Sequence, residues 1–165
     1  MDLTNPMHIA TKSSKIDITL EKDTKSISQK ISNYLSKGDI VFFYGEIGVG
    51  KTTFIKYLIN YLQSKLNKKI TEIPSPTFNI VYEYKIDELI IQHYDLYRVK
   101  SEMELKNIGL FENQKKSITL IEWPEIINEK PKNIIELNFN YEENLSKRSL
   151  IISSKYKKKI FDEFK

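Results

Sequence analysis

Hydrophobic and polar residues follow two different periods near the start of the chain. At 16–20, isoleucine and leucine alternate with polar residues, which predicts a strand with one buried face. At 26–36 the apolar side chains recur at helical spacing, and Gly38 follows as a stop signal. The pattern therefore predicts a short strand and then a helix.

The next segment changes to a continuous apolar run followed by an amphipathic stretch. Residues 40–44 (IVFFY) have the length and aromatic content of a strand buried on both faces, as in a parallel sheet. From 52 to 66 the apolar side chains make one stripe with a period near 3.6 residues, which predicts a helix that packs one face on a core. The stripe consists of Phe54, Ile55, Leu58, Ile59, Leu62 and Leu66.

The second half of the chain predicts more strands than helices. Segments 80–84 and 89–94 are apolar runs joined by a short turn at 86–88, the pattern of an antiparallel hairpin. Pro74 and Pro76 exclude a central strand between them. Further elements are predicted as strands at 117–121, 134–141 and 149–152, a short helix capped by Ser101 and Glu104, and a helical segment at 155–164.

Between the strand at 40–44 and the helix from 52 lies a glycine-rich sequence. Residues 45–52 (GEIGVGKT) fit the pattern G-x-x-x-x-G-K-[ST] without a mismatch. The glycines let the backbone turn its N–H groups toward phosphate oxygens, while Lys51 reaches the β- and γ-phosphates and the Thr52 hydroxyl holds magnesium. The same pattern occurs by chance on surface loops, but a buried strand before it and an amphipathic helix after it favour a site for ATP or GTP.

Two acids stand where a P-loop enzyme needs a carboxylate to hold magnesium or its waters. Glu122 directly follows the apolar strand at 117–121, as a Walker-B acid does, and Asp95 follows the strand at 89–94. A strand-end acid can also cap a turn or pair with lysine, yet two acids in this setting favour the functional interpretation. Thr77, in the segment Ser75-Pro76-Thr77-Phe78, is a candidate switch residue for the γ-phosphate; a proline-stiffened turn explains it equally well.

Composition and charge set the remaining limits. The chain of 165 residues fits one domain (1–165), with flexible ends expected at 1–14 and in the lysine-rich segment 155–165. No apolar run approaches the roughly 20 residues that cross a bilayer, no signal peptide is visible, and cysteine is absent, so we expect a cytoplasmic protein. The net charge of +4 comes almost entirely from lysine, which favours a solvated tail over a nucleic-acid surface.

Several nucleotide-binding classes are disfavoured. The base-reading Asn-Lys-x-Asp of GTPases is missing, because Asn67 and Lys68 are not followed by the aspartate, and the signature of transporter ATPases is absent. A small-molecule kinase usually has an arginine-rich lid, and this chain has only Arg98 and Arg148. Arg98 is compatible with an arginine finger, although a surface ion pair is the simpler interpretation. The elements and the motif together predict an α/β fold: a P-loop NTPase-type three-layer sandwich, with a mostly parallel central sheet and an inserted antiparallel hairpin.

Five separated segments resemble one protein family in order and spacing. They are KGDIVFFYGEIGVGKTTFIK (37–56), SPTFNIVYEY (75–84), HYDLYRV (93–99), ELKNIGL (104–110) and LIEWPE (120–125). The chain is similar there to TsaE (YjeE), the bacterial P-loop ATPase of tRNA threonylcarbamoyladenosine (t6A) synthesis. The resemblance extends from about residue 24 to about residue 152. One departure is Val49, which stands where the family often has alanine.

The resemblance implies roles for individual residues. Lys51, Asp95, Glu122 and Thr77 would be catalytic, with Thr52, Asp95 and Glu122 at the Mg²⁺ ion. ATP would lie against Glu46, Gly48, Val49, Gly50, Lys51, Thr52, Thr53 and Trp123. For Trp123, packing in the core is an alternative that is compatible with this place, and we interpret His93 as structural.

The resemblance also implies an indirect role in t6A synthesis. The chain would bind the TsaD–TsaB complex, which modifies adenosine 37 of tRNA, and its ATP hydrolysis would reset that complex. It would meet tRNA only through the complex, with no role at DNA or a membrane, and its ATPase activity alone would be weak. Two alternatives stay open: a small-molecule kinase, and a regulator that binds a nucleotide without hydrolysing it.

Overall fold

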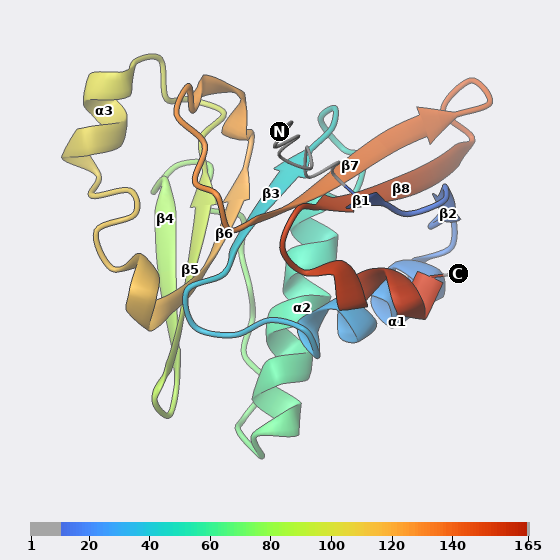
Figure 1. Cartoon of the computed structure of the whole chain (residues 1–165), viewed down its shortest axis with the longest axis horizontal. Coiled ribbons are helices and arrows are strands. Elements are labelled where there is room, and N and C mark those ends of the chain that lie inside the picture. Colours follow the sequence, from blue (N-terminus) through green and yellow to red (C-terminus); the bar gives the residue numbers. More distant parts are fainter. Residues whose placement is uncertain (1–10, 165) are drawn as a thin grey trace, which may run out of the picture.

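A single mixed sheet forms the centre of the molecule, and helices cover it on both faces (Figure 1). The computed structural model describes residues 11–164, so part of the N-terminal segment expected to be flexible lies outside the described residues. The strands of this part are β1 (Thr11–Lys12), β2 (Ile16–Asp17), β3 (Ile40–Tyr44), β4 (Val81–Ile86), β5 (Leu89–Asp95), β6 (Ser117–Glu122), β7 (Ile134–Glu142) and β8 (Lys147–Ser154). The helices are α1 (Glu21–Ser32), α2 (Lys51–Lys65), α3 (Glu102–Asn107) and the 3-10 helices η1 (Gln114–Lys116), η2 (Pro124–Ile126) and η3 (Lys158–Phe164).

The strand order is β1-β8-β7-β3-β6-β5-β4, and β2 also pairs with β8. The centre is parallel, because β3 pairs in parallel with both β6 and β7, and β5 pairs in parallel with β6. The predicted hairpin is β4–β5, and its second strand belongs to the parallel centre of the sheet. The sheet therefore confirms the predicted P-loop NTPase type of α/β fold. Parallel strands end at one edge of a sheet, so β3, β5 and β6 carry the residues that follow them to the same place.

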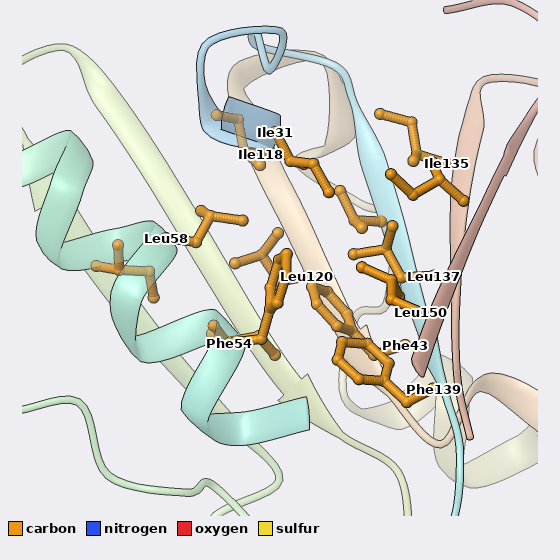
Figure 2. Packing of buried hydrophobic residues seen from close by; sticks show 14 of the residues in the cluster. Ile31, Phe43, Phe54, Leu58, Ile118, Leu120, Ile135, Leu137, Phe139 and Leu150 are labelled. Carbon is orange, nitrogen blue, oxygen red and sulfur yellow. The ribbon is translucent and has the colours of Figure 1, made fainter. Parts of the chain in front are cut away.

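Strand β3 is buried on both faces, as its unbroken apolar sequence predicts, and it separates two cores. Val41 and Phe43 point to the side covered by α1, α2 and η3, where they pack with Phe54 and Leu58 of α2. Figure 2 shows Phe43, Phe54 and Leu58 between α2 and the strands, with Phe139 of β7 stacked beside Phe43. Ile40 and Phe42 point to the other side, where a smaller core lies beneath α3 and η2. Strand β3 thus holds the P-loop in a fixed place between two packed layers.

Two sequence predictions at the ends of the chain need correction. The strand predicted at 16–20 is only β2, because the carbonyl of Leu20 already accepts the N–H groups of Asp23 and Thr24 and opens α1. Consequently α1 begins at Glu21 and ends at Ser32, earlier at both ends than predicted. The lysine-rich segment near the C-terminus is not a free tail, since Ile160 and Phe161 of η3 are buried in the α1–α2 core. No helix in the range 11–164 is both long and apolar enough to span a bilayer.

Candidate functional site

The glycine-rich loop connects the end of β3 to the start of α2. Gly45 has φ +138°, and a Cβ there would lie 2.7 Å from the carbonyl oxygen of Phe139, so any larger residue would collide with β7. Gly50, at φ +115°, is the N-cap of α2 and lets the chain turn directly into the helix. The loop therefore needs glycine at these two positions to lie tightly against the sheet.

The first turn of α2 has no acidic residue, unlike the first turns of α1 and α3, and it has no capping side chain, unlike that of α3. The N–H groups at a helix start are unpaired and carry a partial positive charge. In α3 that charge is met by acidic residues and by Ser101, whose hydroxyl accepts the N–H of Glu104 as predicted. The start of α2 is left free for an external anion, which is the arrangement that binds phosphate.

Lys51 lies at this helix start and is almost fully buried. Its Nζ donates to the carbonyl oxygens of Gly45 and Glu46, and it lies 4.0 Å from the centre of the Trp123 ring. Burial lowers the pKa of Lys51, while the negative charges of Glu122 and other nearby acids oppose that shift. A buried ammonium group with neutral carbonyl partners is a strong attractor for phosphate oxygens, which are charged acceptors.

The two predicted acids lie side by side, because Asp95 of β5 is the register partner of Glu122 of β6. Both are buried, with exposed fractions of 4% and 2%. The Thr52 hydroxyl lies 2.9 Å from each carboxylate oxygen of Glu122 and donates to this carboxylate. A hydroxyl that donates its proton still offers its lone pairs to a cation. Thr52 and Glu122 are therefore arranged as the threonine and Walker-B acid of a magnesium site.

Thr77 is also at the site, and it contacts an acid. Its hydroxyl donates to Asp95 Oδ2 at 2.6 Å, and Ser75 lies 2.7 Å from Thr77 in the same loop. The other oxygen, Asp95 Oδ1, accepts the backbone N–H of Tyr97 at 3.0 Å. Ile80, which closes the loop, has φ +66°, a rare conformation for a β-branched residue. The loop thus brings the predicted switch threonine to the side of the pocket where Asp95 lies.

Trp123 follows Glu122 in a left-handed conformation, with φ 57° and ψ 54°. Its ring packs against that of Tyr97 at 4.9 Å between centroids, lies beneath the ammonium of Lys51, and also contacts the smaller core. Strained backbone of this kind clusters at functional sites, where the surrounding structure holds it. Trp123 lines the candidate pocket and also packs on a neighbour, so its contact with a nucleotide stays a prediction.

These groups surround one pocket of about 280 Å³. Of the predicted nucleotide contacts, Glu46 and Val49 do not line it: Glu46 supplies only a carbonyl to Lys51, and the Val49 side chain is buried in the core. The lining residues are Ile47, Gly48, Gly50, Lys51, Thr52, Thr53, Ser75, Thr77, Asp95, Tyr97, Glu122 and Trp123. A larger hollow of about 540 Å³ lies near Lys130 and Tyr156 and contains none of the predicted site residues.

The donor set fits Mg²⁺ bound together with a nucleotide. Between residues 11 and 164, no three histidine, cysteine, aspartate or glutamate side chains come together as ligands for a metal ion. Mg²⁺ is usually held by one or two carboxylates, substrate phosphates and several waters, so a larger cluster is not required. Thr52, Asp95 and Glu122 would supply the protein part of that shell.

Three residues of the site were missed or underrated by the sequence analysis. His93 Nε2 lies 2.9 Å from Glu122 Oε1, although we interpreted His93 as structural. Ser75 and Tyr97 line the pocket without having been named as site residues. For His93 a signal was available, since residues two apart on a strand share a face and Asp95 lies on that face.

Comparison with known proteins shows the family of this chain. The family model described as "Threonylcarbamoyl adenosine biosynthesis protein TsaE" matches residues 18–150, which is most of the chain. The chain belongs to the TsaE family. A TsaE protein of Rickettsia bellii is 38% identical over 137 residues, covering 82% of this chain and 92% of that protein. The TsaE protein of Bacillus subtilis is 36% identical over 110 residues, covering 66% and 65% of the two chains.

The fold is shared with a solved structure. The crystal structure of Bacillus subtilis YdiB superimposes with a TM-score of 0.70 and covers 95% of this chain and 96% of that one. The identity over this superposition is 22%, so the likeness concerns the fold alone. The P-loop, Asp95 and Glu122 all lie inside the segment that the TsaE family model matches.

Proposed function

We propose that this TsaE-family chain binds and hydrolyses ATP with Mg²⁺ and serves tRNA t6A synthesis through the TsaD–TsaB complex. The observation that carries the ATPase part is the meeting of Lys51, Thr52, Asp95 and Glu122 around one pocket. A phosphate-binding lysine, a magnesium-binding hydroxyl and a Walker-B carboxylate are the parts that P-loop enzymes use for phosphoryl transfer.

Each group has a defined task in this proposal. The N–H groups at the start of α2 and the Lys51 ammonium bind the phosphates, and Thr52 and the two acids hold Mg²⁺ or its waters. Bound Mg²⁺ supplies positive charge to the β- and γ-phosphate oxygens. The hydroxyl of Thr77 bonds to the Asp95 carboxylate. When ATP binds, we expect Thr77 to leave this bond and to contact groups around the γ-phosphate.

The place of this activity in t6A synthesis is supported by the TsaE names of the relatives. The arginine-poor composition, with Arg98 and Arg148 as the two arginines of the chain, argues against the arginine-rich lid of a small-molecule kinase and favours hydrolysis. We therefore propose an accessory role: the ATPase resets TsaD–TsaB, and the chain meets tRNA only through that complex.

A reconstitution tests the role in the pathway. TsaD, TsaB, tRNA and the threonylcarbamoyl donor would be incubated with this chain, and t6A per TsaD would be measured over time. The expected result is many turnovers with the wild-type chain and about one without it or with Lys51→Ala. Full multiple turnover with Lys51→Ala would contradict the proposal. Multiple turnover with intact ATP would instead identify a regulator that binds the nucleotide without hydrolysing it.

A further inference from the structure

The imidazole of His93 is completely buried, with an exposed fraction of 0%, and makes one hydrogen bond within the described part of the chain. Its Nε2 lies 2.9 Å from Oε1 of Glu122. A carboxylate only accepts hydrogen bonds, so the tautomer of His93 that carries its proton on Nε2 is the one that donates to Glu122. The other ring nitrogen, Nδ1, has no partner between residues 11 and 164.

A buried nitrogen without a partner is a disadvantage for folding, because it loses its hydrogen bond to water and gains nothing in exchange. An apolar ring such as phenylalanine would fill the same space without that loss. Packing therefore does not explain a histidine at this position, whereas the bond from Nε2 to Glu122 does.

The register of the sheet makes this bond possible. His93 pairs with Leu120 across β5 and β6, so Glu122 lies two residues farther along on the same face. The Glu122 carboxylate consequently has a donor from each of two elements: His93 from β5 and Thr52 from α2. Two donors from different directions fix the plane of the carboxylate, which a single donor leaves free to rotate.

We infer that His93 is a positioning residue for Glu122, holding its carboxylate in the orientation that completes the Mg²⁺ site. This inference rests on the proposed Mg²⁺–nucleotide site. Without the His93 donor, the Glu122 carboxylate would keep the Thr52 hydroxyl as its side-chain partner and would be free to rotate about its terminal bond. A rotated carboxylate would no longer be held in the orientation that the Mg²⁺ site requires.

The test compares nucleotide affinity with and without magnesium, so it does not depend on hydrolysis. Trp123 is the only tryptophan of the chain and lies at the site, so its fluorescence reports ADP binding. ADP is titrated in Mg²⁺ and in EDTA for wild type, His93→Phe and His93→Gln. The amide of glutamine reaches the Nε2 position and still donates. Gln92→Leu is the matched control, because Gln92 is a buried polar residue of β5 bonded to Ser117, away from the pocket.

We expect His93→Phe to lower the magnesium-dependent gain in ADP affinity by about tenfold or more, as outer-shell substitutions at metal sites do. Affinity in EDTA should change by less than about twofold, and His93→Gln should recover the gain to within about threefold. Gln92→Leu should behave like wild type in this titration. Should His93→Phe fail to fold by circular dichroism, His93→Met removes the donor with a flexible side chain and replaces it in the comparison.

The outcomes separate the two proposals. A wild-type chain whose ADP affinity does not respond to Mg²⁺ would overturn the proposed function itself. If wild type responds to Mg²⁺ and His93→Phe responds equally, the positioning role is wrong and the proposed function stands. The positioning role is also wrong if His93→Gln is as defective as His93→Phe, since the donor would then not be the property that matters.

Discussion

The Thr52 hydroxyl oxygen lies 2.9 Å from each of the two carboxylate oxygens of Glu122 and donates to this carboxylate. This contact joins the first turn of α2 to the end of β6. It orients the hydroxyl so that its lone pairs face the pocket that Asp95 also lines. In the proposed function, this threonine and this acid would together hold the Mg²⁺ ion.

Replacing Lys51 by methionine should abolish tight nucleotide binding while leaving the fold intact. Methionine keeps most of the length and apolar volume of the side chain but has no charge for phosphate oxygens. Because burial already lowers the pKa of Lys51, removing its charge should not weaken folding. We expect at least a tenfold rise in the Kd for ATP, about 1.4 kcal/mol, by isothermal titration calorimetry. An unchanged Kd for ATP would mean that Lys51 does not bind the phosphates. The control is Lys56→Met, at an exposed position of α2.

The contact between Thr77 and Asp95 predicts a difference between ATP and ADP. Thr77→Val keeps the shape of the side chain but cannot donate to Asp95 or interact with a γ-phosphate. Hydrolysis of ATP should fall about tenfold or more, while ADP affinity should stay within about twofold of wild type. The two quantities come from phosphate release and from Trp123 fluorescence. Equal losses for ATP and ADP would mean that Thr77 only supports the loop.

Gly45 and Gly38 provide a matched pair for the stability of the P-loop. Both have positive φ, but a Cβ at Gly45 meets the Phe139 carbonyl at 2.7 Å, while nothing lies within 4 Å of one at Gly38. Gly45→Ala should therefore lower the free energy of unfolding by about 1–3 kcal/mol more than Gly38→Ala does. Urea unfolding followed by circular dichroism measures both. Equal losses of unfolding free energy in the two variants would show that the loop can shift away from β7 at no energetic cost.

Tyr84 of β4 predicts a pH dependence of stability. Its hydroxyl is buried without a partner in the described structure, and burial raises its pKa to about 12. The folded protein thus keeps the Tyr84 proton while the unfolded chain loses it near pH 10, so stability contributed by Tyr84 is lost as pH rises from about 10 to about 12. Tyr84→Phe removes this loss and the unpaired hydroxyl.

For Tyr84→Phe we expect a gain of about 1 kcal/mol in the free energy of unfolding at pH 7. The gain should become larger above about pH 10, where wild-type tyrosine begins to ionise in the unfolded chain. Thermal unfolding at pH 7 and at several alkaline values provides the comparison. A gain that stays constant or shrinks with rising pH would contradict the burial of this hydroxyl.

Local sequence patterns predicted most of the fold, because the decisive signals lie within single elements. The apolar run at 40–44, the stripe on α2 and the motif between them required no knowledge of distant contacts. The boundary between β2 and α1 was wrong because the alternation at 16–20 continues into residues that already cap a helix. The acidic residues Glu21 and Asp23 in its first turn were the signal for the earlier start.

The candidate site was also predicted only in part from the sequence. The strand-end positions of Asp95 and Glu122 follow from the sequence, but their direct pairing depends on the register of β5 against β6. The same register brings His93 to Glu122, and no local pattern contains that information. The packing of η3 was likewise hidden, because the lysines around Ile160 and Phe161 suggested solvent while those two side chains enter the core.

The central claim is that Glu122 makes this chain a magnesium-dependent ATPase, and phosphate release from ATP tests it most directly. The rate would be measured with Mg²⁺ for the chain alone and with TsaD–TsaB, for wild type and for Glu122→Gln. We predict a slow rate alone, a clear increase with the partners, and a loss of about a hundredfold in Glu122→Gln. A Glu122→Gln variant that releases phosphate at the wild-type rate under both conditions would contradict the claim.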